Sequence, residues 1–529
     1  MGQHSSGPDG ATPATYFVGR WLFLRLLGVV YLIAFLSLWV QIEGLVGSAG
    51  ILPLGDYLDW IRQHAGADRF LQAPTLLWIG HSDGMLDALC GAGVLLAFLL
   101  VAGVATIPAL FLLWAVYLSL VIGGQTFLSF QWDVLLLEAG FCALFLAPAT
   151  LRPRPPWLEP APSAAGLWLL RLLLFKLLFL SGIVKLISLD RTWWELTALD
   201  YHYFTQPLPT WTSWYAHQLP GWFQKLSILL MYVIEIAVPF LIFFSRLWRR
   251  LACVALVFLQ LLIAFTGNYG FFNLLTVVLC VLLLDDALLL RLVPRRWRPA
   301  SAPRPGVGMW QGLVASRDPR RLARALPTLM VLTLIGVSGL TFVREMVRTE
   351  PAEGIGGIVG ALFRGADRYV LSWGQPYVLR WTRPFRTING YGLFRGMTTA
   401  RPEIVFEGSL DGRTWMAYEF KWKPGAVTRR PVFIAPHQPR LDWQMWFAAL
   451  SPRRAAPWLQ GLTLRLLEGS PDVLELLGGN PFPDRPPRYV RAIAYRYQFT
   501  TPGEKRKDGA WWSRKRVRVL LGPVSLSDF

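Results

Sequence analysis

Residues 21–40 read WLFLRLLGVVYLIAFLSLWV, an apolar run in which Arg25 is the one charged residue. A helix of about 20 apolar residues is long enough to cross the roughly 30 Å hydrocarbon core of a bilayer. Comparable runs recur through the first two thirds of the chain, at residues 21–40, 85–104, 108–124, 130–147, 167–188, 226–244, 251–266, 271–290 and 326–343. The sequence therefore predicts a polytopic α-helical membrane protein with about nine spans.

The composition agrees with this class, since 54% of the 529 residues are hydrophobic and 16% are charged. Such a chain is too apolar to be an ordinary soluble enzyme. Its net charge of +19 does not indicate nucleic-acid binding, because the arginines gather in loops between the apolar runs. By the positive-inside rule those loops face the cytoplasm. With the N-terminus inside and nine spans, the chain after residue 343 is expected on the outer side of the membrane.

The sequence pattern changes after residue 343. Apolar and polar residues alternate in short runs with β-branched and aromatic side chains, a pattern that predicts strands. A mostly antiparallel, sandwich-like β domain is expected, with a helix at 442–450 and with 462–467 open between strand and helix. The expected divisions are a flexible N-terminus at 1–20, a helical membrane domain at 21–343 with a basic cytoplasmic loop at 291–325, a linker at 344–374 and an outer-facing β domain at 375–529.

Charged residues inside the apolar spans need a partner or a water-filled cavity, because an isolated charge in hydrocarbon is costly. Lys176 and Glu235 lie near the middle of two consecutive predicted spans, and we expect them to pair with each other. Glu138 lies in a third span. Lys185 is near the outer end of its span, where a lysine side chain can extend to the interface.

The loop at residues 189–225 is rich in Trp, Tyr and Phe. Such residues favour the membrane interface, so one interpretation is a segment that lies on the outer leaflet. The alternative is an outer cavity lined by Asp200, His202 and His217 that accepts a lipid or an apolar segment of another protein. The spacing of these residues matches no metal-ligand pattern, and no metal or other cofactor is expected.

Three stretches of the tail carry a family resemblance: LRWTRPFRTINGYGLFRGM at 379–397, RPEIVFEGS at 401–409 and HQPRLDWQMWF at 437–447. Together with residues 23–53 and 199–220 they resemble the lipase maturation factor family along nearly the whole chain. The resemblance implies a non-enzymatic membrane factor that helps exported proteins, including lipases, to fold, and that contacts these clients through its C-terminal domain. It also implies the endoplasmic reticulum membrane, or the inner membrane if the chain is bacterial.

Arg and aromatic residues are common anchors in protein contacts, but they also stack together inside β domains. Both readings stay open for the candidate client-binding residues, which are Arg383, Phe385, Arg386, Asn389, Tyr391, Phe394, Arg395, His437, Asp442, Trp443 and Trp446. His437 and Asp442 resemble half of a catalytic triad, yet no Gly-x-Ser-x-Gly motif accompanies them. They are more simply explained as residues that order a loop.

A second, local resemblance points to a different class. Residues 179–194, FLSGIVKLISLDRTWW, are similar to a segment of vitamin K-dependent gamma-carboxylases. That similarity implies an integral membrane enzyme in which Lys185 is the catalytic base, a role that requires burial or a neighbouring cation to favour the neutral amine.

Overall fold

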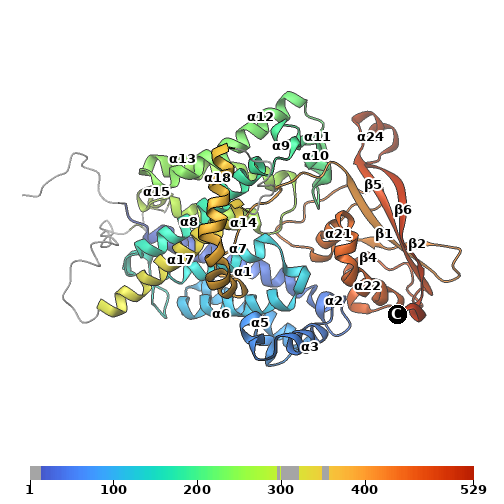
Figure 1. Ribbon diagram of the computed structural model, residues 1–529, viewed down its shortest axis with the longest axis horizontal. Helices are drawn as coiled ribbons and strands as arrows, with labels where there is room; N and C mark the ends of the chain where they lie inside the picture. The colour runs from blue at the N-terminus through green and yellow to red at the C-terminus, as the bar shows by residue number, and fades with distance from the viewer. Residues whose placement is uncertain (1–13, 293, 295–297, 299–320, 348–356) are drawn as a thin grey trace, which may run out of the picture.

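The computed structural model describes residues 14–292, 294, 298, 321–347 and 357–529 of the chain. A bundle of long helices forms one part, and strands with short helices form a second part at one end of it (Figure 1). The second part, residues 398–529, is called the C-terminal region below. The predicted flexible N-terminus lies outside the described residues up to residue 13, and so does most of the predicted basic loop at 291–325.

Seven helices in the described part of the chain are long and apolar enough to cross a membrane. They are α1 (Phe17–Trp39), α5 (Asp83–Ala102), α6 (Thr106–Gly123), α8 (Ala164–Ile187), Gly221–Phe243 beginning with α12 (Gly221–Tyr232), α13 (Arg246–Thr266), and Leu329–Val347 within α17 (Arg321–Val347). The pair Phe272–Leu283 and Asp286–Leu292, bent by 113°, makes an eighth if counted as one span. The polytopic helical class is thus confirmed, with a span number close to the predicted nine.

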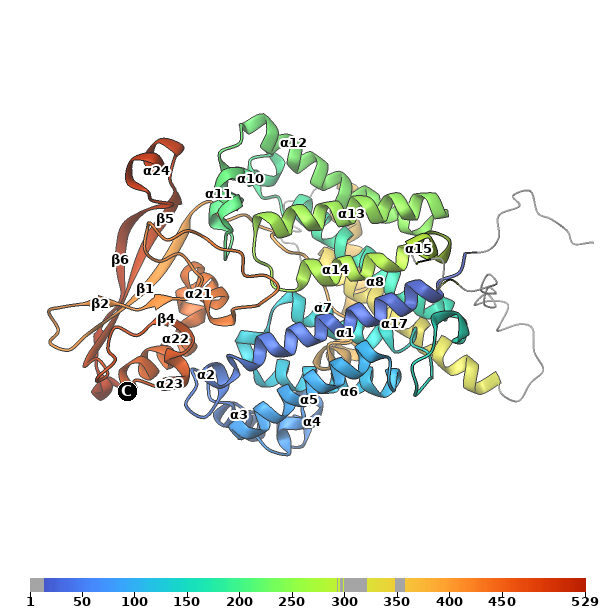
Figure 2. The ribbon, with the colours of Figure 1, turned by 180° about the vertical axis from the view of Figure 1, so that it is seen from behind.

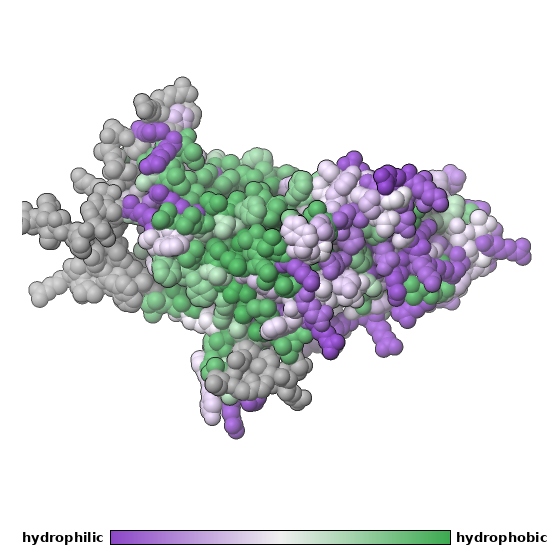
Figure 3. All heavy atoms as spheres, turned by 90° about the horizontal axis from the view of Figure 1, so that it is seen from above, coloured by the Kyte–Doolittle hydropathy of each residue, from purple (hydrophilic) through white to green (hydrophobic). Residues whose placement is uncertain are grey.

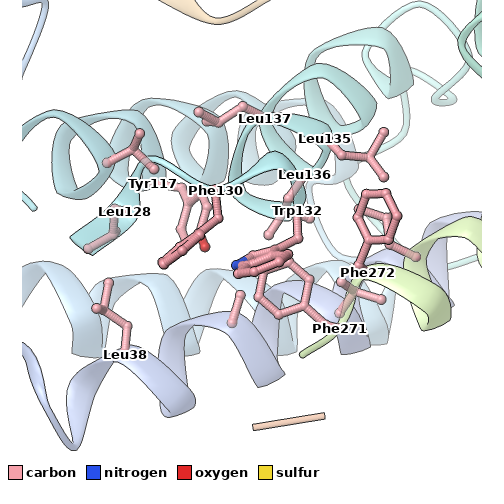
Figure 4. Close-up of a cluster of buried hydrophobic side chains, with 14 of the residues drawn as sticks. Leu38, Tyr117, Leu128, Phe130, Trp132, Leu135, Leu136, Leu137, Phe271 and Phe272 are labelled. Atoms are coloured by element: carbon pink, nitrogen blue, oxygen red, sulfur yellow. The ribbon is translucent and has the colours of Figure 1, made fainter. Parts of the chain in front are cut away.

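Helix α7 (Gln131–Ala143) explains part of the difference between the predicted and the observed number of spans. The sequence predicts a span at 130–147, but the helix has only 13 residues because the chain turns at residues 144–147 before Pro148. Most of α7 is buried by its neighbours. Figure 4 shows its Trp132, Leu135 and Leu136 in an apolar cluster with Tyr117 of α6 and Phe271. This helix is therefore an inner element of the bundle.

Helix α1 lies in the middle of the bundle and packs most closely on α5 (Figure 2). Its buried side chains include Phe23, Leu27, Tyr31 and Phe35, which recur at every fourth position and so share one face. The two helices approach closely at Gly93, where an added Cβ would overlap the Phe35 ring. The surface of the bundle seen in Figure 3 is largely hydrophobic, in contrast with the mostly hydrophilic C-terminal region. This contrast is typical of a protein whose helices face lipid.

The C-terminal region is built on an antiparallel sheet in the order β2-β1-β5-β6. Its strands are β1 (Arg401–Ser409), β2 (Met416–Ala417), β5 (Tyr489–Phe499) and β6 (Trp512–Val524), and a smaller sheet pairs β3 (Glu419–Phe420) with β4 (Leu477–Gly479). The predicted antiparallel sheet is confirmed. Its second layer is mainly helical, formed by α21 (Arg440–Leu450) and α22 (Pro452–Glu468), so the predicted helix at 442–450 is present and the ambiguous residues 462–467 are also helical.

Short helices complete the chain: α2 (Ile42–Val46), α3 (Leu54–Ala65), α4 (Arg69–Gln72), α9 (Arg191–Trp194), α10 (Ala198–Thr205), α11 (Trp211–His217), α23 (Pro471–Leu474) and α24 (Pro502–Asp508). In the segment expected to be a linker, α17 runs to Val347 and a helical stretch begins with α18 (Gly357–Ala366). That stretch continues through α19 (Ser372–Gly374) and α20 (Arg380–Thr382) to a last turn at Arg383–Phe385. Residues 387–397, called the docking segment below, then run along the membrane helices.

Candidate functional site

The C-terminal region is joined to the helical bundle by an ion pair that is completely buried. Arg440, the first residue of α21, donates from both terminal nitrogens to the carboxylate of Asp133 in α7, at 2.8 and 2.9 Å. The same carboxylate accepts a hydrogen bond of 2.6 Å from Tyr117, and the Phe127 carbonyl accepts another of 3.0 Å from Arg440. A bidentate guanidinium–carboxylate pair fixes orientation as well as distance. This contact therefore sets how α21 sits on the bundle.

Sequence reasoning missed this pair. An acidic residue at the start of an apolar segment, such as Asp133, is expected to be solvated at the interface, and Arg440 is not among the candidate site residues predicted above. Two signals were available: an acidic residue at the start of an apolar segment, and an arginine inside the family-like stretch HQPRLDW. The sequence alone does not bring them together, because they are 307 residues apart.

A second buried contact centres on Glu138 of α7. Lys176 of α8 donates to one carboxylate oxygen at 2.5 Å, and the other oxygen accepts from the Asn389 backbone N–H and the Tyr391 hydroxyl, both at 2.8 Å. The Asn389 side-chain amide adds a bond of 3.2 Å. The docking segment therefore reaches the buried charge, and two predicted client-binding residues, Asn389 and Tyr391, pack inside the molecule.

The expected pairing of Lys176 with Glu235 is wrong. Glu235 pairs instead with Lys185 at 2.7 Å, and Lys185 also donates to the Ser181 carbonyl at 2.6 Å. The predicted extension of Lys185 to the interface is also wrong, because this side chain is buried. The two lysines of α8 are nine positions apart, so they face different neighbours: Lys176 faces α7 and Lys185 faces the helix that carries Glu235.

A cavity of about 590 Å³ lies beside the Lys185–Glu235 pair, and it is called the outer cavity below after the cavity expected from the sequence. Its walls are mostly apolar and aromatic side chains of α10, α11, α12 and α13. The predicted cavity in the loop at 189–225 thus has a counterpart in the structure, with His202 in its wall. His217 and Asp200 are not among its lining residues: His217 packs between the Phe204 and Phe499 rings, and Asp200 is exposed.

His202 is held in an environment that favours its neutral form. Its Nε2 lies 3.3 Å from the Tyr269 hydroxyl. Burial, and to a lesser extent the nearby Lys185 ammonium, lowers the pKa of His202 to about 4. Burial also lowers the pKa of His217.

The low pKa of His202 predicts a loss of stability in acid. Unfolding exposes an imidazole with an ordinary pKa near 6.5, so the unfolded chain binds more protons between about pH 4 and pH 6.5. The stability that the neutral His202 contributes to the folded chain is fully present above pH 6.5, and it falls as the pH is lowered towards 4. Replacing His202 by asparagine should therefore reduce the drop in unfolding temperature between pH 7 and pH 5, measured on the detergent-purified chain. If the unfolding temperature of the variant falls as much as that of the original chain, His202 does not have a lowered pKa.

A second cavity of about 590 Å³, called the junction cavity, lies between the bundle and the C-terminal region. Its walls include Phe394 and Arg395 of the docking segment and Trp443 and Trp446 of α21. Four of the predicted client-binding residues therefore meet here. Phe394 and Tyr269 line both cavities, with their ring centres 6.0 Å apart and edge to face, so they form the partition between them.

The remaining predicted residues lie elsewhere. Arg383 and Arg386 line a separate surface cavity of about 470 Å³, and Phe385 packs against the core. His437 Nδ1 lies 2.9 Å from the Ser37 hydroxyl of α1, while Asp442 accepts backbone N–H bonds from Trp422 and Lys423 at 2.9 and 2.8 Å. These two side chains thus hold different contacts and do not form a catalytic pair. Within the described ranges, no cluster of His, Cys, Asp and Glu has the arrangement of a metal site.

Two family models match the chain. The lipase maturation factor transmembrane domain matches residues 18–291, and the lipase maturation factor C-terminal domain matches residues 387–522. Lipase maturation factor 2 of Homo sapiens is 39% identical over 96% of this chain and 83% of its own length, and that of Gallus gallus is 38% identical over 96% and 82%. Lipase maturation factor 1 of Bos taurus is 35% identical over 98% and 91%.

No solved structure matches the chain. The two domain matches occur in order along the chain, and the second begins at residue 387, where the docking segment begins. With these matches and with relatives similar along almost its full length, the chain belongs to the lipase maturation factor family.

Proposed function

We propose that this chain is a membrane-anchored maturation factor that helps lipases, or exported proteins of similar kind, to reach their active fold. The family membership and the names of its relatives support this role. We place the bundle in the endoplasmic reticulum membrane, or in an inner membrane if the chain is bacterial, with residues 375–529 on the lumenal or outer side. Arg246 and Arg250 support this orientation, because they lie at the end of α13 remote from the sheet (Figure 2).

We place the proposed client contact at strand β6. It is one of the two edge strands of the main sheet, and most of its 13 residues are exposed. An edge strand offers unpaired backbone N–H and C=O groups to an extended segment of another chain. Val517 and Val519, 55% and 47% exposed, add apolar contact, while Lys515, Arg516 and Arg518 attract acidic segments. A partly folded client can therefore add a strand here.

Charge reversal along β6 tests this contact. The variant Lys515→Glu, Arg516→Glu, Arg518→Glu should lower the amount of lipase captured with the chain by about tenfold, the effect of losing roughly 1.4 kcal/mol of binding. The measurement is capture of a co-expressed secreted lipase, together with secreted lipase activity, in cells that lack their own maturation factor.

A matched control changes the net charge equally at exposed sites away from the strand: Arg453→Glu, Arg485→Glu, Arg488→Glu. It should retain capture and activity. Equal losses in both variants would contradict a contact at β6, and full capture by the β6 variant would place the client elsewhere.

The carboxylase-like alternative is not favoured. A lysine acts as a base when its surroundings favour the neutral amine. Lys185 is instead buried and donates to the Glu235 carboxylate at 2.7 Å and to the Ser181 carbonyl at 2.6 Å, so its amine is already engaged in contacts within the bundle. We therefore assign the Lys185–Glu235 pair a structural role in the wall of the outer cavity. The proposed maturation function needs no catalytic residue and no cofactor.

A further inference from the structure

The outer cavity opens towards the membrane. Several residues of its wall are also exposed on the lipid-facing surface of the bundle, among them Phe223 of α12 and Leu262 and Phe265 of α13. Phe265 is 57% exposed. At the inner end the partition of Tyr269 and Phe394 separates this cavity from the junction cavity. A ligand of the outer cavity therefore enters sideways, from the bilayer.

The size and lining of the cavity suit a hydrocarbon chain. Its volume of about 590 Å³ lies within the range of roughly 300–1,000 Å³ found for pockets that enclose small ligands. The charged groups at its inner end do not oppose an apolar ligand, because Lys185 and Glu235 satisfy each other and His202 is neutral at ordinary pH.

Cationic side chains of the C-terminal region stand beside the aromatic wall. The Arg430 guanidinium lies 4.7 Å from the Trp211 ring centre. The Lys505 ammonium lies 3.3 Å from the Trp511 ring centre and 4.9 Å from that of Tyr215. Of these rings, Trp211 and Tyr215 line the outer cavity. Arg506 and Lys507 of α24 are exposed next to Lys505. In the part of the chain that the structure describes, neither Arg430 nor Lys505 forms an ion pair, whereas Glu504 of α24 is held by Thr501 at 2.8 and 2.9 Å.

We propose that the outer cavity binds an acyl chain of one anionic membrane phospholipid, whose phosphate is held by Arg430 and Lys505. The charge of these residues selects an anionic headgroup over an apolar peptide segment, and the lateral opening selects a ligand that comes from the bilayer. The bound lipid would touch α11, α12 and α13 of the bundle and α24 of the C-terminal region. It would therefore link the two regions at the membrane surface, independently of client contact at β6.

The test uses the full-length chain purified in a mild detergent, with bound lipid measured by mass spectrometry of the intact complex. Phosphatidylglycerol, an anionic phospholipid, and phosphatidylcholine, which is zwitterionic, are the added probes. We expect about one tightly held phosphatidylglycerol per chain and binding of phosphatidylcholine about tenfold weaker. Equal binding of the two lipids would overturn the headgroup assignment.

Variants of two kinds test the acyl-chain cavity and the headgroup contact separately. Ala216→Phe, which fills the cavity from α11, should abolish retention of either lipid, and Ser227→Phe, which fills it from α12, serves if the first variant folds poorly. Arg430→Gln with Lys505→Gln should reduce the preference for phosphatidylglycerol, whereas Arg485→Gln with Arg488→Gln should not. Unchanged lipid retention in a folded cavity-filled variant, or its replacement by a bound peptide, would overturn the proposal.

Discussion

Replacing Arg440 by alanine is expected to destabilise the folded chain by about 3–5 kcal/mol, the range found when one partner of a buried ion pair is removed. The variant leaves the Asp133 carboxylate in a fully buried site, with Tyr117 as its remaining hydrogen-bond donor. It also frees the first turn of α21 from the bundle. The measurement is the unfolding temperature of the detergent-purified chain, together with the rate at which a protease cleaves the C-terminal region.

The matched control is Arg491→Ala. Arg491 pairs with Glu407 at 2.6 Å, but this pair joins β5 to β1 within the sheet and is partly exposed. Partly exposed ion pairs contribute about 0–1 kcal/mol, so the control should be nearly neutral. The double variant Asp133→Asn, Arg440→Met removes both charges and should recover much of the loss. A loss from Arg440→Ala no larger than that of the control would show that this pair does not hold the two regions together.

Much of the fold could be predicted because it depends on local pattern. The lengths of apolar runs identify helices such as α1 and α8, and period-2 alternation identifies β5 and β6. The helix at α21 follows from its apolar periodicity. Helix α7 shows the limit of this reasoning, since an apolar run with Pro148 at its end forms a short buried helix as readily as a span.

The candidate site depends on contacts that local pattern does not encode. Lys176 and Glu235 lie at similar depth in their predicted spans, which favours a pair between them. The partners depend instead on the direction in which each side chain points from its helix, and this direction brings Lys176 to Glu138 and Lys185 to Glu235. The docking segment shows the same limit. Its Arg and aromatic residues fitted an exposed client surface and a packed interior equally well, and the structure buries Asn389 and Tyr391 against Glu138 while it places Phe394 and Arg395 beside cavities.

The docking segment is held to the bundle by its hydrogen bonds to Glu138. Glu138→Leu removes the acceptor for Asn389 and Tyr391 and leaves the Lys176 ammonium unpaired among buried residues. An unpaired buried charge costs about 3–5 kcal/mol, so we expect a loss of that size. Tyr391→Phe deletes only one hydrogen bond to a charged group, which contributes about 1.5–3 kcal/mol. The two losses are measured as shifts of the unfolding temperature.

Lys176→Met combined with Glu138→Gln provides the decisive comparison. This pair of changes removes both charges but keeps an amide oxygen that accepts from the Tyr391 hydroxyl, so its loss should be smaller than that of Glu138→Leu alone. Cleavage within residues 387–397 gives a second readout, because only release of the docking segment exposes its backbone to a protease. If Glu138→Leu neither lowers the unfolding temperature nor speeds this cleavage, the segment is held by its other contacts, among them the bonds of Phe394 and Met397 with Trp193 and Asp190. The Glu138 network would then be a means of neutralising Lys176, with no part in joining the two regions.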